Sequence, residues 1–158
     1  AATPAERVAY LKMRRAMAGL AVVAEVDDEE DVDASGVEID YPAMSAAEDL
    51  ILTISASGSG KLSSSHDYPV RGRGGQGVMA MDKAMRGGAL VASFPVELDD
   101  QIMLATSKGQ SIRVPVDGIS FRSRSAGGVR VFDTGEGEEV VSVAWIADQG
   151  EEEDGAEE

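Results

Sequence analysis

Residues 49–55 read Asp-Leu-Ile-Leu-Thr-Ile-Ser, and residues 100–106 read Asp-Gln-Ile-Met-Leu-Ala-Thr. Aligning these segments sets Ile51 on Ile102 at an offset of 51 residues, and the glycines and arginines downstream then also correspond. Each copy runs in the same order: a short apolar stretch, a glycine turn, a mixed stretch, an Arg- and Gly-rich segment and a valine-rich end. The sequence therefore contains an internal repeat, with a period typical of stacked structural units.

Each copy of the repeat predicts four short strands separated by polar, glycine-bearing connections. Four strands in about 50 residues are typical of propeller-like blades, so we expect an all-β fold of two four-stranded repeats. Two blades cannot close a ring, so an open blade edge must be covered or belong to a longer parent. The predicted strands are residues 50–55, 61–66, 77–82 and 89–96 in the first copy and 101–106, 110–114, 128–133 and 140–147 in the second.

The segments on either side of the repeats differ from them in composition. Thr3, Pro4 and Glu6 form a capping-box pattern that predicts a short helix over residues 4–17, with Gly19 placed to end it. Acidic residues dominate 25–40 and the end of the chain, which predicts a disordered linker and a disordered tail. The expected division is 1–42 for the helix and acidic insertion, 43–97 for the first blade, 98–148 for the second, and 149–158 for the tail.

The charge of the chain is distributed in three blocks. The formal net charge of -15 divides into -8 over residues 1–49, +4 over 50–132 and -11 over 133–158. Because exposed charges are screened beyond about 8 Å at physiological salt, a ligand near the middle block responds mainly to that block. The acidic total therefore does not exclude nucleic acid as a partner, and the tail is placed to compete with it.

Other classes of protein are disfavoured by composition. The chain has no cysteine and one histidine, so no disulfide framework or zinc cluster is expected, and a reducing, cytoplasmic location fits. No apolar run reaches 18 residues, so we expect no membrane span. The first residue, Ala1, is not Met, which indicates a fragment or a processed chain.

Several short motifs invite catalytic interpretations that their context does not support. The Gly-x-Gly-x-x-Gly pattern at 72–77 enters a predicted strand rather than a helix, and Gly58-Ser-Gly60-Lys61 lacks the Ser or Thr of a phosphate loop. Residues 63–67, Ser-Ser-Ser-His-Asp, are too close in sequence to converge as a triad. The paired carboxylates Asp99 and Asp100 are expected to form a turn between the repeats.

Basic residues recur with the repeat, since Arg71 and Arg73 correspond to Arg122 and Arg124. Neighbouring glycines would let a polyanion approach the backbone, which favours a phosphate-tracking surface with little base readout. The alternative is that these side chains solubilise the surface or bind neighbouring carbonyl groups. The candidate DNA contacts are Lys61, Arg71, Arg73, Lys83, Arg86, Lys108, Arg113, Arg122, Arg124 and Arg130.

Together these residues resemble the C-terminal domain of the bacterial DNA gyrase A protein. The likeness rests on residues 48–54, on Gly60-Lys61, on Tyr-Pro-Val-Arg-Gly-Arg-Gly-Gly-Gln-Gly-Val at 68–78, and on Gly-Gly-Val-Arg-Val-Phe-Asp at 127–133. It implies a six-bladed β-pinwheel of which this chain supplies the last two blades and the tail. The acidic segment resembles an insertion between blades found in some members.

The resemblance also implies a role in DNA wrapping within an ATP-dependent type IIA topoisomerase that introduces negative supercoils. The catalytic tyrosine would lie in another domain, so Tyr10, Tyr41 and Tyr68 are not expected to be catalytic and no cofactor is expected in this chain. ATP and Mg²⁺ would act through other domains, within an A2B2 heterotetramer with the gyrase B protein on nucleoid DNA in the cytoplasm.

Two departures from the family pattern leave alternatives open. The family's Gln-Arg-Arg-Gly-Gly-Lys-Gly box is not present, and residues 71–77 look like a partial copy of it. The corresponding protein of topoisomerase IV has a related domain and is the alternative parent. A third possibility is a structural or protein-interaction end-piece that completes the pinwheel without binding DNA.

Overall fold

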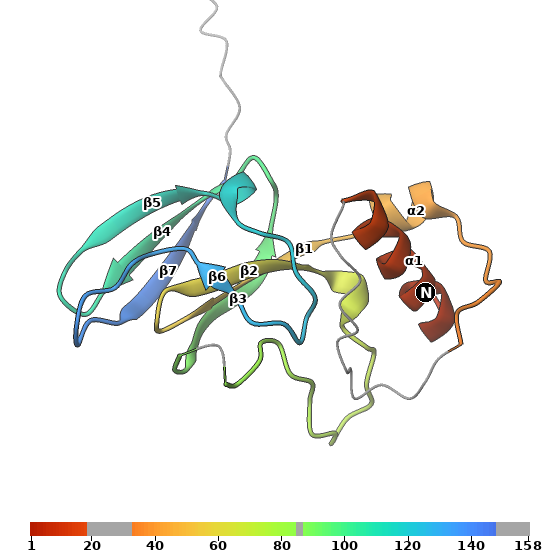
Figure 1. Cartoon of the computed structure of the whole chain (residues 1–158), viewed down its shortest axis with the longest axis horizontal. Coiled ribbons are helices and arrows are strands. Elements are labelled where there is room, and N and C mark those ends of the chain that lie inside the picture. Colours follow the sequence, from red (N-terminus) through yellow and green to blue (C-terminus); the bar gives the residue numbers. More distant parts are fainter. Residues whose placement is uncertain (19–32, 85–86, 148–158) are drawn as a thin grey trace, which may run out of the picture.

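Seven strands form two antiparallel sheets in the part of the chain that the structure, a computed structural model, describes: residues 1–18, 33–84 and 87–147 (Figure 1). The strand order in the first sheet is β3-β1-β2-β6, and in the second it is β5-β4-β7. The all-β prediction is confirmed. The strands are β1 (Leu50–Ser55), β2 (Ser59–Ser64), β3 (Leu90–Val96), β4 (Gln101–Thr106), β5 (Ser111–Pro115), β6 (Val129–Arg130) and β7 (Val140–Ile146).

Six of these strands form equivalent three-stranded units, with β1, β2 and β3 matching β4, β5 and β7. The central strand of each unit places alternate apolar residues in the shared core, as expected for a strand with one buried face. Leu52 and Ile54 are fully buried in β1, as are Ile102 and Leu104 in β4. The backbone repeats at an offset of 51 residues: the Ser65 N–H donates to the Asp49 carbonyl at 2.9 Å, and the Val116 N–H donates to the Asp100 carbonyl at 3.0 Å. The predicted alignment of Ile51 on Ile102 is therefore confirmed, and the two central strands bury opposite faces against each other, as stacked blades do.

The fourth strand of the first sheet, β6, comes from the second sequence repeat. It pairs with β2 at Ser59 and Gly60, so the predicted division after residue 97 separates the sequence repeats but not the sheets. Segment 120–122 of the second repeat also lies along β2: the Leu62 N–H donates to the Ser120 carbonyl at 2.9 Å, and the Arg122 N–H donates to the Leu62 carbonyl at 2.7 Å. The outer edge of the first sheet is therefore covered by the second repeat.

The backbones of β2 and β6 approach so closely that glycine is required at the crossing. A Cβ atom on Gly128 would lie 2.7 Å from the amide nitrogen of Gly60 and 2.9 Å from its carbonyl oxygen. Main-chain atoms in a paired strand cannot move aside for it. Gly58, in the turn between β1 and β2, has a φ of +81°, and its carbonyl accepts from the N–H groups of Val131 and Phe132.

The predicted strand over 77–82 was wrong: these residues lie in a long connection between β2 and β3 that has turns and bends instead. By the repeat, this segment corresponds to β6, which pairs with the second strand of the unit before it, and the described residues contain no unit before the first. Its backbone therefore has no partner strand in the described sheets. Met81 is nevertheless fully buried, which anchors the end of the connection.

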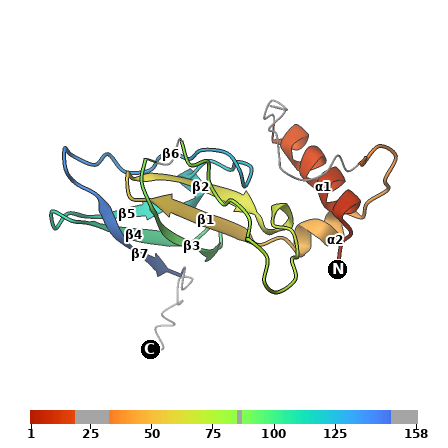
Figure 2. The ribbon, with the colours of Figure 1, turned by 90° about the horizontal axis from the view of Figure 1, so that it is seen from below.

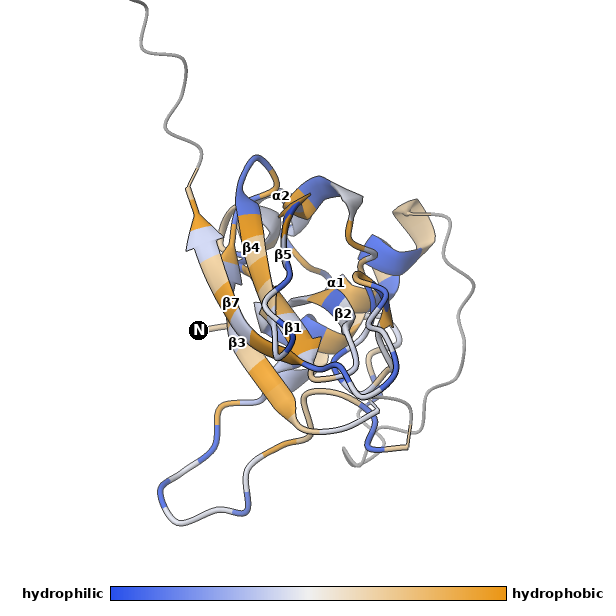
Figure 3. Cartoon of the chain, turned by 90° about the vertical axis from the view of Figure 1, so that its left-hand side faces the viewer, coloured by the Kyte–Doolittle hydropathy of each residue, from blue (hydrophilic) through white to orange (hydrophobic). Residues whose placement is uncertain are grey.

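The core lies between the two sheets and is aliphatic, as the small aromatic content indicates. In Figure 3 the apolar stretches gather on the strands, while the connecting loops are mostly hydrophilic or neutral. Strands β3 and β7 contact each other, which joins the two units on the side away from β5 and β6. The buried cluster contains Leu52, Ile54, Leu62, Val96, Ile102, Leu104, Val116, Ile119 and Val140.

Two α-helices, α1 (Pro4–Met17) and α2 (Tyr41–Ala46), lie together at one end of the molecule (Figures 1 and 2). The predicted span of α1 and its capping box are confirmed, and Ala18 is the C-cap. Gly19, which was predicted to end the helix, lies outside the described residues. Tyr10 is fully buried and stacks on Tyr41, with ring centroids 5.0 Å apart. Burial raises the pKa of the Tyr10 hydroxyl. Neither helix is long and apolar enough to cross a membrane, within the described residues.

The helix α2 was not predicted, and it begins directly after the expected linker over residues 25–40. Asp40 accepts a hydrogen bond from the Ala43 N–H as the N-cap, and Pro42 occupies the first turn, so local capping starts this helix immediately after the acidic stretch. Residues 33–40 belong to the described chain, whereas 19–32 and the tail from 148 lie outside it. The predictions of disorder over 25–32 and 149–158 therefore remain predictions.

One carboxylate in the second unit gives the fold a dependence on pH. Glu138 accepts hydrogen bonds from the Thr106 hydroxyl at 2.5 Å and from the Gly135 N–H at 2.9 Å. The Thr106 bond, followed by the Gly135 bond, lowers the pKa of Glu138 below its ordinary value of 4.5. A carboxyl with a lowered pKa in the folded state stabilises the fold above its unfolded pKa, and this contribution is lost as pH falls through the folded pKa.

We therefore expect Glu138→Gln to reduce the loss of stability on acidification. Urea unfolding of the wild-type chain and the variant, measured from pH 6 to pH 3, should show a difference in stability that shrinks as the pH falls below about 4.5. The matched control is Glu139→Gln, since Glu139 is exposed. A Glu138→Gln profile parallel to that of the wild type would contradict the prediction.

Candidate nucleic-acid interface

The outer strands of the two sheets carry exposed basic side chains. Arg113 lies on β5, at the outer edge of the second sheet, and Arg130 lies on β6, at the outer edge of the first. Lys108 lies in the turn between β4 and β5, and Arg122 lies on the segment that leads into β6. All four are exposed. Arg113 and Arg130 thus place positive charge on β5 and β6, while Lys108 lies in a turn that contacts residues 136–139, next to the start of β7.

Two of these four residues, Lys108 and Arg130, make a polar contact within the chain while their side chains remain exposed to solvent. The Lys108 ammonium donates to the Glu136 carbonyl at 2.5 Å. Arg130 lies 3.4 Å from the carboxylate of Asp133, and the two side chains are 74% and 81% exposed. Ion pairs this exposed contribute little and exchange readily with another anion.

A second group of basic residues lies on the connection between β2 and β3. Arg71, Arg73 and Lys83 are exposed, and residues 70–77 follow an open path outside the sheets. Gly74 and Gly77 in this connection have φ values of +80° and +76°, and no atom lies within 4 Å of a Cβ built on either. Glycine is therefore favoured at these two positions by the positive φ of the backbone and not by close packing against another residue. Arg86, another predicted contact, lies outside the described residues.

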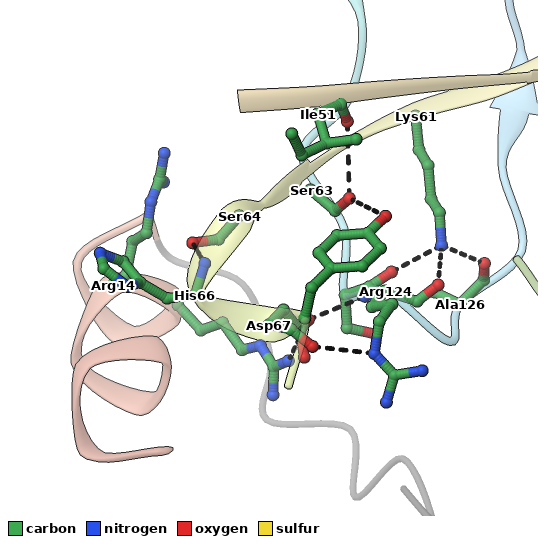
Figure 4. Close-up of polar contacts among 12 residues, drawn as sticks. Arg14, Ile51, Lys61, Ser63, Ser64, His66, Asp67, Arg124 and Ala126 are labelled. Atoms are coloured by element: carbon green, nitrogen blue, oxygen red, sulfur yellow. Dashed lines mark hydrogen bonds and ion pairs between the residues drawn. The ribbon is translucent and has the colours of Figure 1, made fainter. Parts of the chain in front are cut away.

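Lys61 is not a surface residue, so its predicted role in DNA contact was wrong. Its side chain is fully buried, and its ammonium donates to the carbonyl groups of Ser123 at 2.7 Å, Arg124 at 2.5 Å and Ala126 at 2.6 Å (Figure 4). Burying an ammonium group is costly unless it is hydrogen-bonded, and three carbonyl acceptors meet that need. Lys61 therefore holds segment 123–126 of the second repeat against β2.

Arg124 is also structural rather than exposed, and its predicted DNA contact is corrected in the same way. The residue is 5% exposed. Its guanidinium donates to the Asp67 carbonyl at 2.8 Å and to the Met79 carbonyl at 2.6 Å. These bonds tie the connection between β2 and β3 to the second repeat. Of the two arginines that the repeat equates, Arg73 is exposed and Arg124 is buried.

Asp67 is a residue that sequence analysis missed as a structural centre. It ends the 3-10 helix η1 (Ser65–Asp67), and its carboxylate accepts the Arg124 N–H at 2.8 Å and lies 3.7 Å from the Arg15 guanidinium (Figure 4). Its position directly after a strand and next to a histidine was the available signal. Asp67 thereby links α1, η1 and the second repeat.

The residues of the dismissed triad pattern engage different partners. The Ser64 hydroxyl accepts the His66 N–H at 3.2 Å as the cap of η1. The His66 imidazole Nε2 lies 2.8 Å from the Met44 carbonyl, which only accepts, so Nε2 carries a proton. The Ser63 hydroxyl lies 3.1 Å from the Tyr68 hydroxyl. Residues 63–66 thus form hydrogen bonds that connect α2 and the residue after η1 to the end of β2.

Two consecutive antiparallel units, whose edge strands β3 and β7 contact each other and whose opposite edge strands β5 and β6 carry exposed arginines, define a propeller-type repeat domain. The chain matches the family described as DNA gyrase C-terminal domain, beta-propeller, over residues 49–96 and 100–144. The chain therefore belongs to the DNA gyrase C-terminal domain family, and the resemblance identified from the sequence is confirmed.

Relatives of known identity support the same assignment. The DNA gyrase A protein of Granulibacter bethesdensis is 42% identical over 160 residues, covering 90% of this chain and 16% of that protein. The DNA gyrase A protein of Rickettsia conorii is 38% identical over 125 residues, covering 77% and 14%. The chain thus spans less than one-fifth of the length of these relatives.

Solved structures show the same fold at lower sequence identity. A DNA gyrase A C-terminal domain superposes with a TM-score of 0.58 at 24% identity, covering 63% of this chain and 34% of that one. The C-terminal domain of a DNA topoisomerase IV gives a TM-score of 0.57 at 22% identity, covering 63% and 31%.

Proposed function

We propose that this chain is a DNA-binding module that bends duplex DNA along the outer strands of its two sheets. The observation that carries the proposal is the exposure of basic side chains on the rims of successive units, at Lys108, Arg113, Arg122 and Arg130. Contacts of this kind bind phosphates without reading bases, and repetition from one unit to the next suits an extended polyanion. The exposed loop with Arg71 and Arg73 would contact DNA as it leaves the rim.

The larger role follows from family membership together with this surface. In a full-length DNA gyrase A protein, the module would present bent DNA to a cleavage site elsewhere in the complex and so direct ATP-dependent negative supercoiling. Under this proposal, ATP, Mg²⁺ and the gyrase B protein act through other parts of an A2B2 assembly on cytoplasmic, nucleoid-associated DNA. The chain itself supplies binding surface rather than catalytic groups.

The test of DNA binding uses the exposed rim residues and leaves the buried ones intact. The double substitution Arg113→Glu/Arg130→Glu is expected to weaken binding to a 40-base-pair duplex about tenfold, alike for unrelated sequences. The slope of log affinity against log salt should fall by about 0.9 for each lost phosphate contact. Fluorescence anisotropy at several salt concentrations measures both quantities.

The single reversal Lys12→Glu, on the exposed side of α1, controls for net charge and is compared with Arg113→Glu and Arg130→Glu as single variants, since each of the three changes the net charge by two. It is expected to weaken binding less than threefold. Equal losses for the single rim variants and this control would mean that DNA responds only to total charge. Unchanged binding of the rim variant at low salt would remove the proposed rim.

The second candidate is a protein-interaction end-piece, which the open strand edges favour. Strands β5 and β7 each have one edge without a partner strand in the described sheets, and Val141 on β7 is 56% exposed. Such an edge suits pairing with a neighbouring blade. Binding to separately prepared preceding blades, with no DNA binding at low salt, would favour this candidate over the first.

A further inference from the structure

A pocket of about 470 Å³ lies where β3 of the first sheet and β7 of the second sheet end. Phe94, Pro95 and Val96 from β3 and Trp145 from β7 form its apolar lining. This volume lies within the range of about 300 to 1,000 Å³ that is usual for ligand sites. The pocket joins both units, and it uses none of the basic residues assigned to DNA contact.

The tryptophan in this pocket is held in place although it is exposed. Trp145 is 56% exposed, yet its indole N–H donates to the Asp100 carboxylate at 2.7 Å. The same carboxylate oxygen accepts the Glu97 N–H at 2.7 Å, and Asp100 itself is 4% exposed. The turn between the repeats therefore fixes the indole, so a ligand that packs on it meets a preorganised aromatic surface.

The charge around the pocket is negative. Asp49, Glu97 and Asp100 line it together with the apolar residues, and Asp99 is exposed in the same turn. None of the described residues that line the pocket is basic. Asp100 places a carboxylate against the edge of the indole, while Asp49 and Glu97 remain exposed and able to accept hydrogen bonds. Aromatic faces beside carboxylates attract cations, and most strongly planar guanidinium groups.

We propose that this pocket binds an arginine side chain from a basic segment of a protein partner. The guanidinium would stack on Trp145 while its N–H groups donate to the carboxylates of Glu97 and Asp49. The apolar stem of the arginine would pack against Phe94 and Pro95, as long cationic side chains do on apolar surfaces. Pairing between an aromatic anchor and arginine is common among the strongest contacts of protein interfaces.

The pocket and the DNA rim lie at different parts of the sheets. Asp100 immediately precedes β4, and Lys108 follows the opposite end of the same strand. Phe94 lies on β3 and Trp145 on β7, whereas Arg113 and Arg130 lie on β5 and β6, at the opposite edges of the two sheets. A basic partner at the pocket therefore does not require the DNA surface, and either proposal can fail without the other.

The proposal can be tested with tetra-arginine, tetra-lysine and the neutral tetra-citrulline peptide. Trp145 is the only tryptophan of the chain, so its fluorescence reports directly on the pocket. We expect a saturable change with tetra-arginine, an affinity at least threefold lower for tetra-lysine, and no saturable change with tetra-citrulline. No change at Trp145 on tetra-arginine binding would overturn the proposal.

Variants separate the pocket from general attraction to an acidic protein. Asp49→Asn/Glu97→Gln is expected to weaken tetra-arginine binding about tenfold, and Glu139→Gln, at the opposite end of β7, less than twofold. With a labelled peptide followed by anisotropy, Trp145→Leu should weaken binding about fivefold. Equal losses in Glu139→Gln and in the pocket variant would overturn the proposal, because the attraction would then be nonspecific.

Two further outcomes would assign the pocket to another occupant and so overturn the proposal. If spermidine displaced the labelled peptide as well as tetra-arginine did, the site would be one for free polyamines. If the chain alone formed a dimer in sedimentation that Asp49→Asn/Glu97→Gln abolished, the occupant would be a second copy of the chain.

Discussion

The substitution Lys61→Met is expected to lower the free energy of unfolding by about 3 kcal/mol. Methionine retains most of the apolar stem but removes the ammonium, and the carbonyl groups of Ser123, Arg124 and Ala126 lose a charged donor inside the fold. Each hydrogen bond to a charged group contributes about 1.5 to 3 kcal/mol, and the recovered cost of burying the ammonium offsets part of the sum. Urea unfolding followed by circular dichroism measures the loss.

The control for this substitution is Lys83→Met, which removes an exposed ammonium from the connection between β2 and β3. We expect it to change stability by less than about 0.5 kcal/mol. If Lys61→Met instead left stability unchanged and reduced affinity for DNA, Lys61 would be a DNA contact after all. The two variants thus separate a structural lysine from a binding one.

The second large effect is expected from Gly128→Ala. The added Cβ would lie within 3.0 Å of three main-chain atoms of Gly60, in the strand to which β6 is paired. Overpacking of a rigid interior typically costs about 1 to 3 kcal/mol, and we expect the upper part of this range here because main-chain atoms cannot rotate away. Thermal unfolding should show the loss.

Gly118→Ala is the matched control, since nothing lies within 4 Å of a Cβ at that position and its φ is not positive. It is expected to be neutral to slightly stabilising, as alanine restricts the unfolded chain more than glycine does. A Gly128→Ala variant as stable as this control would mean that β6 can shift on β2 without loss.

The sequence was sufficient to predict the order of the elements, because that order depends on local patterns. Apolar alternation between glycine turns predicted six strands within about two residues of their ends, and the capping box at Thr3 predicted α1. The pattern does not specify which strands pair. The valines at 129 and 131 indicated a strand in the second repeat, but its partner, β2, lies in the first.

Pairing between the repeats also explains which basic residues were assigned wrongly. Lys61 and Arg113 lie on the corresponding strands β2 and β5, where Lys61 opposes Thr53 and Arg113 opposes Met103. Lys61 is buried because segment 123–126 of the next repeat covers it, whereas Arg113 is exposed at the edge of the second sheet. Cations on corresponding strands thus differ in burial because of a neighbouring segment that no local pattern identifies.

The pocket at Trp145 was missed for a related reason. Its lining comes from residue 49, the end of β3, the turn at 97–100 and the end of β7, which meet only when the two units are packed together. Asp99 and Asp100 were predicted to form a turn, and Asp100 does accept turn hydrogen bonds. Its additional bond to the indole follows from three-dimensional proximity rather than from the sequence pattern.

The pairing of β6 with β2 also sets an order of events during synthesis. A ribosome that has released β2 must still extend the chain by ~65 residues before β6 emerges, which takes roughly 3 to 13 s at bacterial elongation rates. Throughout that interval the nascent first sheet has an unpaired edge and a lysine without its acceptors in segment 123–126. The first unit therefore completes its folding only after most of the second has been translated, so a chaperone that shields β2 would act in this interval.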